Sequence, residues 1–524
     1  MTLPSTIPAV LAEAATRFGD RPALIDGARV ISFSGLLDAA RSAASAFLTQ
    51  GVGPGDRVAI WAPNSPEWIL AALGAQMAGA AVVPINTRLK GREAGDILRR
   101  TRACLLVTVE TFLGVDYPAM IAGEDLPQLR TIVRLPGDGA ETWTAFMASG
   151  AGSGAPAVDR SIAALSETDV SDILFTSGTT GAPKGVISAH GQVIALFAEW
   201  ARIVDLREED RMLIVNPFFH TFGYKAGWLA CLIVGATMVP TAQFDVDQTL
   251  ALIDQGGVSF VPGPPTLFQS LLSAPRENLD LSSLRVAVTG AANVPPSLVR
   301  RMGSELGFQR VVTGYGMTEC GVIAMSRPDQ DAESVALTCG RVLPGLELRL
   351  VDDAGVDVEP GRDGEILVRG YGVMVGYLDD PVATAETIDA EGWLRTGDIG
   401  VLAPDATLRI TDRKKDMYIC GGFNCYPAEI EHRLCEHPGV AMAAVVGVPD
   451  ERMGEVGKAF VVPKPGAQLT PEALIAWART EMANYKAPRF VAIVADLPRN
   501  AAGKVLRNAL RDEALNAHPP HATA

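Results

Sequence analysis

The hydrophobic pattern of roughly the first 330 residues alternates between helix-like and strand-like segments. Apolar residues recur at helical spacing over 37–48 and again over 68–78, whereas 57–61 and 81–84 are short apolar runs typical of buried strands. Helices that alternate with buried strands favour largely parallel sheets covered by helices. We therefore predict an α/β fold for this part of the chain.

The pattern changes beyond residue 340. Short strands of alternating polarity, separated by Gly, Pro and Asp turns, predict a small antiparallel barrel or sheet at about 335–412. A run of charged residues then marks a domain boundary, which divides the chain into residues 1–412, a hinge at 413–416, and residues 417–524. In the last part we expect helices at 428–436 and 471–484 and strands at 441–448 and 458–463, a compact α+β domain.

Composition narrows the class of protein. Hydrophobic residues make up 48% of the chain and charged residues 20%, which is typical of a globular protein. The net charge of −15 argues against nucleic acid as a partner. The 7 cysteines are scattered without a CxxC pair, as expected for free thiols in a reducing cytoplasm. The longest apolar stretch, 228–240, is shorter than the ~20 residues that span a bilayer.

The strongest local motif is a loop of hydroxyls and glycines that follows the apolar run 173–175. It reads TSGTTGAPKG over 176–185, and its candidate phosphate-binding residues are Thr176, Ser177, Gly178, Thr179, Thr180 and Lys184. Glycines let backbone N–H groups approach anionic oxygens, and hydroxyls and a lysine add further donors. The lysine precedes Gly185 and Val186, so this is not a Walker A loop. The motif predicts binding of the β- and γ-phosphates of ATP.

Six further motifs follow the phosphate loop in order, and the series extends over essentially the whole chain. They are NPFFHTFG at 216, TGAA at 289, GYGMTE at 314, WLRTGD at 393, ITDRKKDMYICGGFNCYPAEIE at 410 and LPRNAAGK at 497. Together with the phosphate loop, this series resembles the adenylate-forming superfamily. The resemblance implies an AMP-forming acyl-CoA synthetase that uses ATP, Mg²⁺ and coenzyme A on a small carboxylic acid. It also implies a large N-terminal domain of two helix-covered sheets plus a small β-barrel, and a small mobile α+β C-terminal domain.

The resemblance assigns the adenosine site to two regions of the chain. The backbone at Gly290, Ala291 and Ala292 lines the adenine pocket, and the segment of Gly314, Tyr315 and Gly316 contributes an aromatic face for stacking. Thr318 is expected to bond the α-phosphate and Glu319 to bind Mg²⁺, because a carboxylate is a hard ligand suited to that ion. Asp398 and Arg413 are expected to hold the ribose hydroxyls.

The C-terminal domain carries the expected catalytic lysine. By resemblance, Lys504 contacts the substrate carboxylate and the α-phosphate, where an ammonium group stabilises developing negative charge. Lys415 matches the hinge about which this domain turns between the two half-reactions. Gly421 and Gly422 match the wall of the channel for the pantetheine arm of CoA, because glycine leaves room for a thin chain.

The acyl site is expected near the loop that contains His220, which resembles a gate between the ATP and acyl sites. Amino-acid-activating members use an acidic residue in this segment, but here Lys225 is present, so we expect an acid without an α-amino group. The candidate lining residues are Phe219, His220, Tyr224, Lys225, Gly263, Pro264, Pro265, Phe268, Ala291 and Ala292. They are mostly apolar, as ligand pockets tend to be.

The motifs also resemble one actinobacterial clade of the family, whose members activate the propanoate side chain of a two-ring indanedione left by steroid breakdown. On this reading, Lys225 donates a hydrogen bond to a ring ketone of the acid; the alternative is that it faces solvent or pairs with a carboxylate. Medium-chain or aromatic acids, loading of a carrier protein and a non-catalytic nucleotide-binding scaffold stay open as alternatives. The sequence is compatible with a monomer or a homodimer.

Overall fold

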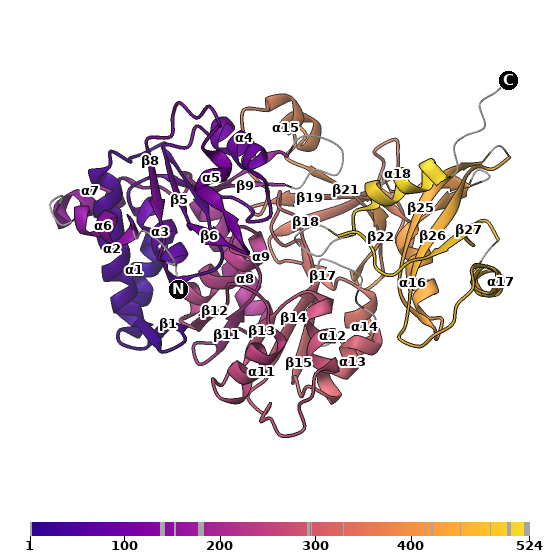
Figure 1. The fold of residues 1–524 in the computed structure, drawn as a ribbon. Helices are drawn as coiled ribbons and strands as arrows, with labels where there is room; N and C mark the ends of the chain where they lie inside the picture. Colours follow the sequence, from indigo (N-terminus) through magenta and orange to yellow (C-terminus); the bar gives the residue numbers. More distant parts are fainter. Residues whose placement is uncertain are drawn as a thin grey trace.

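The computed structural model of the protein describes most of the chain. The described residues are 3–136, 142–150, 154–176, 183–290, 294, 296–328, 330–413, 416–420, 423–450, 452–482, 484–499 and 505–517. Figure 1 shows a large body built by the chain up to β22 (Leu408–Arg413), with the elements that follow grouped beside it.

The first large sheet, here called the nucleotide sheet, has a parallel centre with antiparallel edges. Its strand order is β17-β16-β15-β14-β13-β11-β12-β1-β2. The strands are β1 (Pro22–Asp26), β2 (Arg29–Ser32), β11 (Arg211–Ile214), β12 (Thr237–Pro240), β13 (Phe260–Pro262), β14 (Val286–Gly290), β15 (Arg310–Tyr315), β16 (Ala324–Met325) and β17 (Arg341–Val342). Because β11 to β15 and β1 run parallel, their carboxyl ends meet at one edge.

The second large sheet, here called the N-terminal sheet, has the order β20-β10-β9-β4-β3-β5-β8. Its strands are β3 (Arg57–Trp61), β4 (Ala81–Pro84), β5 (Leu105–Thr108), β8 (Thr131–Arg134), β9 (Val170–Phe175), β10 (Gly185–Ala189) and β20 (Gly376–Tyr377). Strands β9 and β10 are antiparallel neighbours, and the phosphate loop connects them. The edge strand β20 comes from much later in the chain and pairs with β10.

Helices form layers between and outside the two sheets. They are α1 (Ile7–Phe18), α2 (Phe33–Thr49), α3 (Pro66–Met77), α4 (Gly91–Thr101), α5 (Tyr117–Ile121), α6 (Thr142–Ser149), α7 (Ala155–Ala164), α8 (His190–Val204), α9 (Thr221–Gly223), the π-helix η2 (Tyr224–Leu229), α10 (Ala230–Val234), α11 (Val246–Asp254), α12 (Pro265–Ser273), α13 (Pro296–Ser304), α14 (Ala332–Leu337) and α15 (Pro381–Thr387).

Alternating side chains along the strands separate these layers. Val58 and Ile60 of β3 join the core that contains α1, α2, α3, α8 and α10, whereas Ala59 and Trp61 face the core under α4 and α5. The nucleotide sheet divides in the same way, with α11, α12 and α13 on its outer face. Successive residues of a strand point to opposite faces, so a strand buried on both sides reads as a continuous apolar run. This explains the pattern that predicted the strands.

The region expected to form a small barrel contains an antiparallel sheet in the order β18-β19-β21-β22. Its strands are β18 (Leu346–Val351), β19 (Gly364–Gly370), β21 (Leu394–Leu402) and β22. The remaining short hairpin is β6 (Thr111–Phe112) with β7 (Val115–Asp116). The antiparallel sheet leads directly into the C-terminal domain.

The C-terminal domain has a sheet and a hydrophobic core of its own. Its elements are β23 (Tyr418–Cys420), β24 (Phe423–Cys425), α16 (Pro427–Cys435), β25 (Val440–Asp450), β26 (Gly454–Pro463), α17 (Pro471–Glu481), β27 (Phe490–Ile493) and α18 (Arg507–Ala517). Arg507 forms a two-point ion pair with the buried Glu431 at 2.6 and 2.8 Å and also lies 3.5 Å from Asp416. These contacts join α18, α16 and the residue at the end of the expected hinge.

Candidate active site

The site expected from the motifs lies where parallel strands of the nucleotide sheet end. Strand β14 ends at Gly290 beside Gly314 of β15, and the two glycines pair in register. A Cβ on Gly290 would lie 2.8 Å from the carbonyl oxygen of Gly314. Glycine therefore lets the two strand ends approach, at the edge where open α/β sheets bind ligands.

The expected adenine and ribose residues meet at this edge. Tyr315, the last residue of β15, donates a hydrogen bond of 2.6 Å from its hydroxyl to Oδ2 of Asp398 on β21. Desolvation and the neighbouring carboxylate raise the pKa of Tyr315 well above its ordinary value, so the hydroxyl stays protonated and keeps donating. Asp398 also pairs with Arg413 in the ladder between β21 and β22. The two expected ribose contacts therefore stand opposite one another.

The expected magnesium ligand meets the phosphate loop through a residue that the motifs did not identify. Tyr377 donates a hydrogen bond of 2.8 Å to Oε1 of Glu319, and the Lys184 ammonium lies 4.7 Å from the centroid of the Tyr377 ring. Strand β20 brings Tyr377 to this point because it pairs with Val186 of β10, directly after the loop. No local pattern marks Tyr377, because its partners are far away in sequence.

The glycine-rich turn after Tyr315 places Glu319. A Cβ on Gly316 would collide with the carbonyl oxygen of Gly321, and the N–H of Met374 donates to the Glu319 carbonyl at 2.8 Å. Glu319 is half-buried, and its second carboxylate oxygen accepts no hydrogen bond from the described residues. Within those same ranges, no three His, Cys, Asp or Glu side chains gather to hold a metal. A single carboxylate fits Mg²⁺, which is commonly held by one or two carboxylates plus substrate phosphates.

Both ends of the phosphate loop are tied together at its base. The N–H of Thr176 donates to the Lys184 carbonyl at 2.9 Å, and the Thr176 hydroxyl lies 3.4 Å from the Lys184 amide. Arg100 of α4 donates to the Pro183 carbonyl at 2.6 Å and lies over the ring of Phe175. These contacts hold the loop ends, although Ser177, Gly178, Thr179 and Thr180 lie outside the described residues.

The loop that contains His220 is held against both sheets. Asn64, which follows β3, donates to the carbonyls of Ile214 and Asn216 and accepts from the N–H of Phe218. A Cβ on Gly223 would lie 2.2 Å from the carbonyl oxygen of Asn216, so only glycine fits where α9 packs on the loop. Asn64 is a second residue that the motifs did not identify.

His220 begins the helical segment α9. Its side chain accepts a hydrogen bond of 3.2 Å from the N–H of Phe222. The side chain is exposed to solvent, yet the surrounding protein lowers its pKa through desolvation. An accessible neutral imidazole in this position is compatible with the expected gate.

The other expected acyl contacts are engaged inside the protein. Tyr224 is fully buried, accepts a hydrogen bond of 2.8 Å from Gln76 and stacks on Trp228. Phe268 is fully buried and packs edge-on against Phe308. The expected contacts of Tyr224 and Phe268 with the acid stay predictions that rest on the motifs. Gly263 differs, because it directly follows β13 at the edge of the site.

Lys225 follows the alternative that the sequence left open, a pair with a carboxylate. Its ammonium lies 2.9 Å from Oδ1 of Asp172 and donates a hydrogen bond of 2.8 Å to the Ser188 hydroxyl. The side chain is 4% exposed, so the proposed hydrogen bond to a ring ketone does not fit this arrangement. The physical reason is that Asp172 and Ser188 on the N-terminal sheet compensate the buried ammonium.

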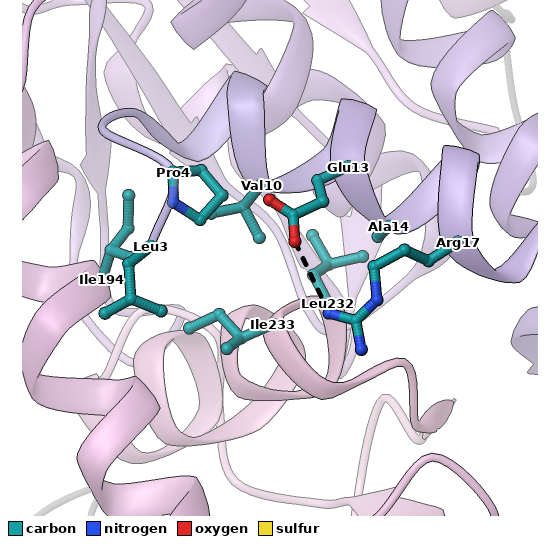
Figure 2. Close-up of a pocket in the computed structure, with 9 residues that line it drawn as sticks. All are labelled: Leu3, Pro4, Val10, Glu13, Ala14, Arg17, Ile194, Leu232 and Ile233. Atoms are coloured by element: carbon teal, nitrogen blue, oxygen red, sulfur yellow. Dashed lines mark ion pairs between the residues drawn. The ribbon is translucent and has the colours of Figure 1, made fainter. Parts of the chain in front are cut away.

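A small apolar cavity lies elsewhere in the molecule. Figure 2 shows that its walls come from α1, α8 and α10 together with Leu3 and Pro4, and that the ion pair of Glu13 and Arg17 stands at its side. Its volume of about 50 Å³ is far below the ~300–1,000 Å³ of ordinary ligand pockets. We therefore do not assign the acid to this cavity.

The remaining expected residues divide into two groups. Thr318 and Gly316 lie in the described turn beside Glu319. Residues outside the described ranges are Lys504, Lys415, Gly421, Gly422, Ala291 and Ala292, and the side chain of Arg413 belongs with them. Their roles stay predictions that rest on the motifs.

Comparison with known proteins identifies the family. Residues 11–378 match the AMP-binding enzyme family, and residues 429–504 match the AMP-binding enzyme C-terminal domain. The chain belongs to the AMP-binding enzymes. Among the helices of the described ranges, none has the length and apolar character that crossing a bilayer requires.

Two relatives resemble the chain over nearly its whole length. A protein of Rhodococcus jostii (strain RHA1) is 50% identical over 522 residues, 97% of this chain and 99% of that protein. One of Mycobacterium tuberculosis (strain ATCC 25618 / H37Rv) is 52% identical over 510 residues, 97% of this chain and 98% of that protein. Both are named as propanoyl:CoA ligases for a 7a-methyl-1,5-dioxo-octahydro-1H-inden-4-yl group.

Two solved structures share the fold. The anthranilate CoA ligase AuaEII in complex with anthranoyl-AMP has a TM-score of 0.86 at 29% identity, covering 99% of this chain and 98% of that one. ATP-bound MatB from Rhodopseudomonas palustris has a TM-score of 0.85 at 27% identity, covering 98% of this chain and 100% of that one. The expected fold class, with a large N-terminal domain and a small C-terminal one, is confirmed.

Proposed function

We propose that this protein is an ATP-dependent CoA ligase for a steroid-derived propanoate, the 7a-methylhexahydro-1,5-indanedione propanoate. The observation that carries the proposal is that the turn after β15 joins the Tyr315–Asp398 pair of the nucleotide sheet to the Lys184–Tyr377–Glu319 cluster at the base of the phosphate loop. The identity of 50–52% over nearly the whole chain to two ligases named for this ring system supports the choice of acid.

The chemistry takes two steps. A carboxylate oxygen of the acid attacks the α-phosphorus of ATP, and the bond to pyrophosphate breaks to leave an acyl-adenylate. The thiol of CoA then attacks the acyl carbonyl, the thiol proton is lost, and AMP departs. In this proposal Lys184 faces the outer phosphates, and Lys504 stabilises charge on the α-phosphoryl group. Glu319 would hold Mg²⁺, which would supply positive charge beside the phosphate oxygens.

The domain turn belongs to the same proposal. Lys504 supports formation of the adenylate in one orientation of the C-terminal domain. After a turn at Lys415, the face with Gly421 and Gly422 lines the CoA channel. The cytoplasmic location and the monomeric or homodimeric state stay predictions of the sequence.

The test is AMP formation with ATP and Mg²⁺, with and without CoA, against a panel of acids. The panel contains the indanedione propanoate, a medium-chain fatty acid and an aromatic acid. We expect CoA-dependent turnover on the indanedione propanoate, with at least tenfold higher kcat/KM than on the others. Lys504→Ala is expected to lower adenylation by about two to three orders of magnitude, the usual cost of removing one such contact.

A control variant at another lysine separates the role of Lys504 from the general effect of removing a positive charge. Lys464 is another lysine of the C-terminal domain, at the start of the turn after β26, and Lys464→Ala is expected to leave turnover within twofold. Preference for the fatty or aromatic acid would overturn the substrate and keep the ligase. Adenylate formation without any CoA-dependent product would instead favour loading of a carrier protein.

A further inference from the structure

A buried ion pair connects the N-terminal sheet to η2, the helical segment that follows the His220 loop. Lys225 belongs to η2, beside the nucleotide sheet, whereas Asp172 and Ser188 lie on β9 and β10 of the N-terminal sheet. Asp172 is fully buried, and Lys225 is 3% exposed. The charges are thus paired with each other and removed from solvent.

The carboxylate is engaged on both oxygens. Oδ1 of Asp172 faces Lys225, and Oδ2 accepts a hydrogen bond of 2.7 Å from the Ser171 hydroxyl. A parallel connection runs through Gln76 of α3, whose amide donates to the Ser171 carbonyl at 3.1 Å and to the Tyr224 hydroxyl at 2.8 Å. Tyr224 and Lys225, two successive residues of η2, are therefore connected to two successive residues of β9.

The strands that hold the pair also hold the phosphate loop. Asp172 and Ser188 are partners in the β9–β10 ladder, which continues in register to the pair Phe175 and Gly185 at the loop base. On the other side, Lys225 lies five positions after His220, which caps α9, the short helix directly before η2. A displacement at the ion pair is thus transmitted within a few residues to both the phosphate loop and the His220 loop.

The helical segment that contains Lys225 is irregular two residues later, at Gly227. Here Gly227 has φ −96° and ψ −106°, outside helical values, and its position leaves room for Ile214 of the nucleotide sheet. A buried ion pair is weak evidence for stability, because well-packed hydrophobic residues of similar volume often do as well. Its value here lies in the geometry that it sets.

We propose that Lys225, Asp172 and Ser188 form a bracket that sets the distance between the phosphate loop and the acyl loop at His220. Lys225 is then a positioning residue for adenylate formation, not a contact of the acid. The inference rests on the proposed function, since it assumes that ATP and the acid meet between these two loops. The bracket explains why η2, directly after the His220 loop, carries a charged residue that does not face a ligand.

The test compares the single variant Lys225→Met with the double variant Lys225→Met/Asp172→Leu. The single variant leaves an uncompensated buried carboxylate, and we expect a large loss of thermal stability. The double variant removes both charges, and we expect its Tm to return close to that of the wild type. Its kcat for pyrophosphate release is expected to stay about 10- to 100-fold low, because a misplacement of about 1 Å costs up to ~100-fold in rate.

The bracket predicts a specific split between kinetic constants. Because each loop keeps its own ligand contacts, KM for ATP and for the acid should change less than about threefold while kcat falls. A merely structural pair would recover kcat together with Tm in the double variant, and that result would overturn the proposal. Unchanged kcat in Lys225→Met would overturn it as well.

A matched ion pair serves as the control. Asp210 and Arg285 pair at the opposite edge of the nucleotide sheet, immediately before β11 and β14. Asp210 is 3% exposed, as buried as Lys225. Asp210→Leu/Arg285→Met is expected to leave kcat within twofold of the wild type. An equal loss of kcat in this control would show a general effect of removing buried charge and would contradict the bracket.

Measurements on the wild type distinguish a failure of this inference from a failure of the proposed function. Equilibrium binding of MgATP to wild type and double variant is measured without any acid. A wild type that binds ATP but prefers another acid overturns only the substrate, and the bracket is then judged on that acid. A wild type that binds no ATP overturns both, and this failure is visible before any variant is made.

Discussion

The hydroxyl of Tyr377 offers the sharpest test of how the site holds its magnesium ligand. Tyr377→Phe removes the hydrogen bond of 2.8 Å to Glu319 but keeps the aromatic ring beneath the Lys184 ammonium. The substitution therefore isolates one donor. The carboxylate of Glu319 is then free to turn away from the phosphates, so that each binding event must orient it again.

The expected size follows from the kind of bond that is lost. A hydrogen bond to a charged group contributes about 1.5–3 kcal/mol, and loss of a residue that orients a metal ligand commonly costs ~10–100-fold. At ~1.4 kcal/mol per factor of ten, the first range corresponds to about 12- to 150-fold. We therefore expect kcat/KM for ATP to fall by about one to two orders of magnitude, with a higher midpoint in a Mg²⁺ titration.

The assay is initial-rate AMP formation over a grid of ATP and Mg²⁺ concentrations. Tyr371→Phe is the matched control, because the Tyr371 hydroxyl donates to the backbone carbonyl of Pro344 and not to a carboxylate. We expect the control to stay within twofold of the wild type. If Tyr377→Phe shows the same Mg²⁺ midpoint and the same kcat/KM as the wild type, the hydroxyl does not orient Glu319 and the reasoning is refuted.

Three further predictions concern other parts of the molecule. Burial lowers the pKa of His190 from 6.5 to about 4, so the unfolded chain binds a proton that the native one does not, and stability falls as pH drops through this window. The His190→Asn variant lacks this proton uptake, so its free energy of unfolding should fall by about 2 kcal/mol less than that of the wild type between pH 6.5 and 5. Thermal melts at pH 7 and 5 check this difference. Asp398→Asn, which removes a charge from the expected ribose site, should raise KM for ATP about tenfold or more in the same initial-rate assay. Arg507→Met leaves buried Glu431 unpaired and should destabilise the C-terminal domain by about 3–5 kcal/mol, seen as faster limited proteolysis there, whereas Arg507→Met/Glu431→Leu should recover.

The sequence predicted the regular elements well where packing follows local periodicity. The strand at 57–61 agrees with β3, and the helices predicted at 37–48 and 68–78 correspond to α2 and α3. Both helices begin earlier than predicted, because Ser32 and Ser65 accept hydrogen bonds from Gly35 and Trp68 and so cap the first turns. The spacing of apolar residues carries no information about helix caps, so it could not place the first residue of either helix.

Contacts between distant segments were beyond the reach of the motifs. Tyr377 enters the site only because β20 pairs with β10, and Asn64 only because the two sheets lie close at the His220 loop. Lys225 shows a different limit. The motifs left open whether Lys225 meets the acid or a carboxylate, and its partner Asp172 lies 53 residues earlier in the sequence. Tyr315 and Glu319 follow one another closely in sequence, whereas Lys184 reaches Glu319 only through Tyr377, across the boundary between the two sheets.

The late arrival of β20 has a consequence for synthesis of the chain on the ribosome. The edge of β10 that β20 will cover emerges roughly 190 residues before β20 itself. At about 5–20 residues per second, that edge waits on the order of 10 to 40 seconds for its partner. An unpaired strand edge is a template for pairing with other chains. The nascent protein therefore passes through a vulnerable interval that ends only when β20 leaves the ribosome, and slow translation or heat should raise its demand for chaperones then.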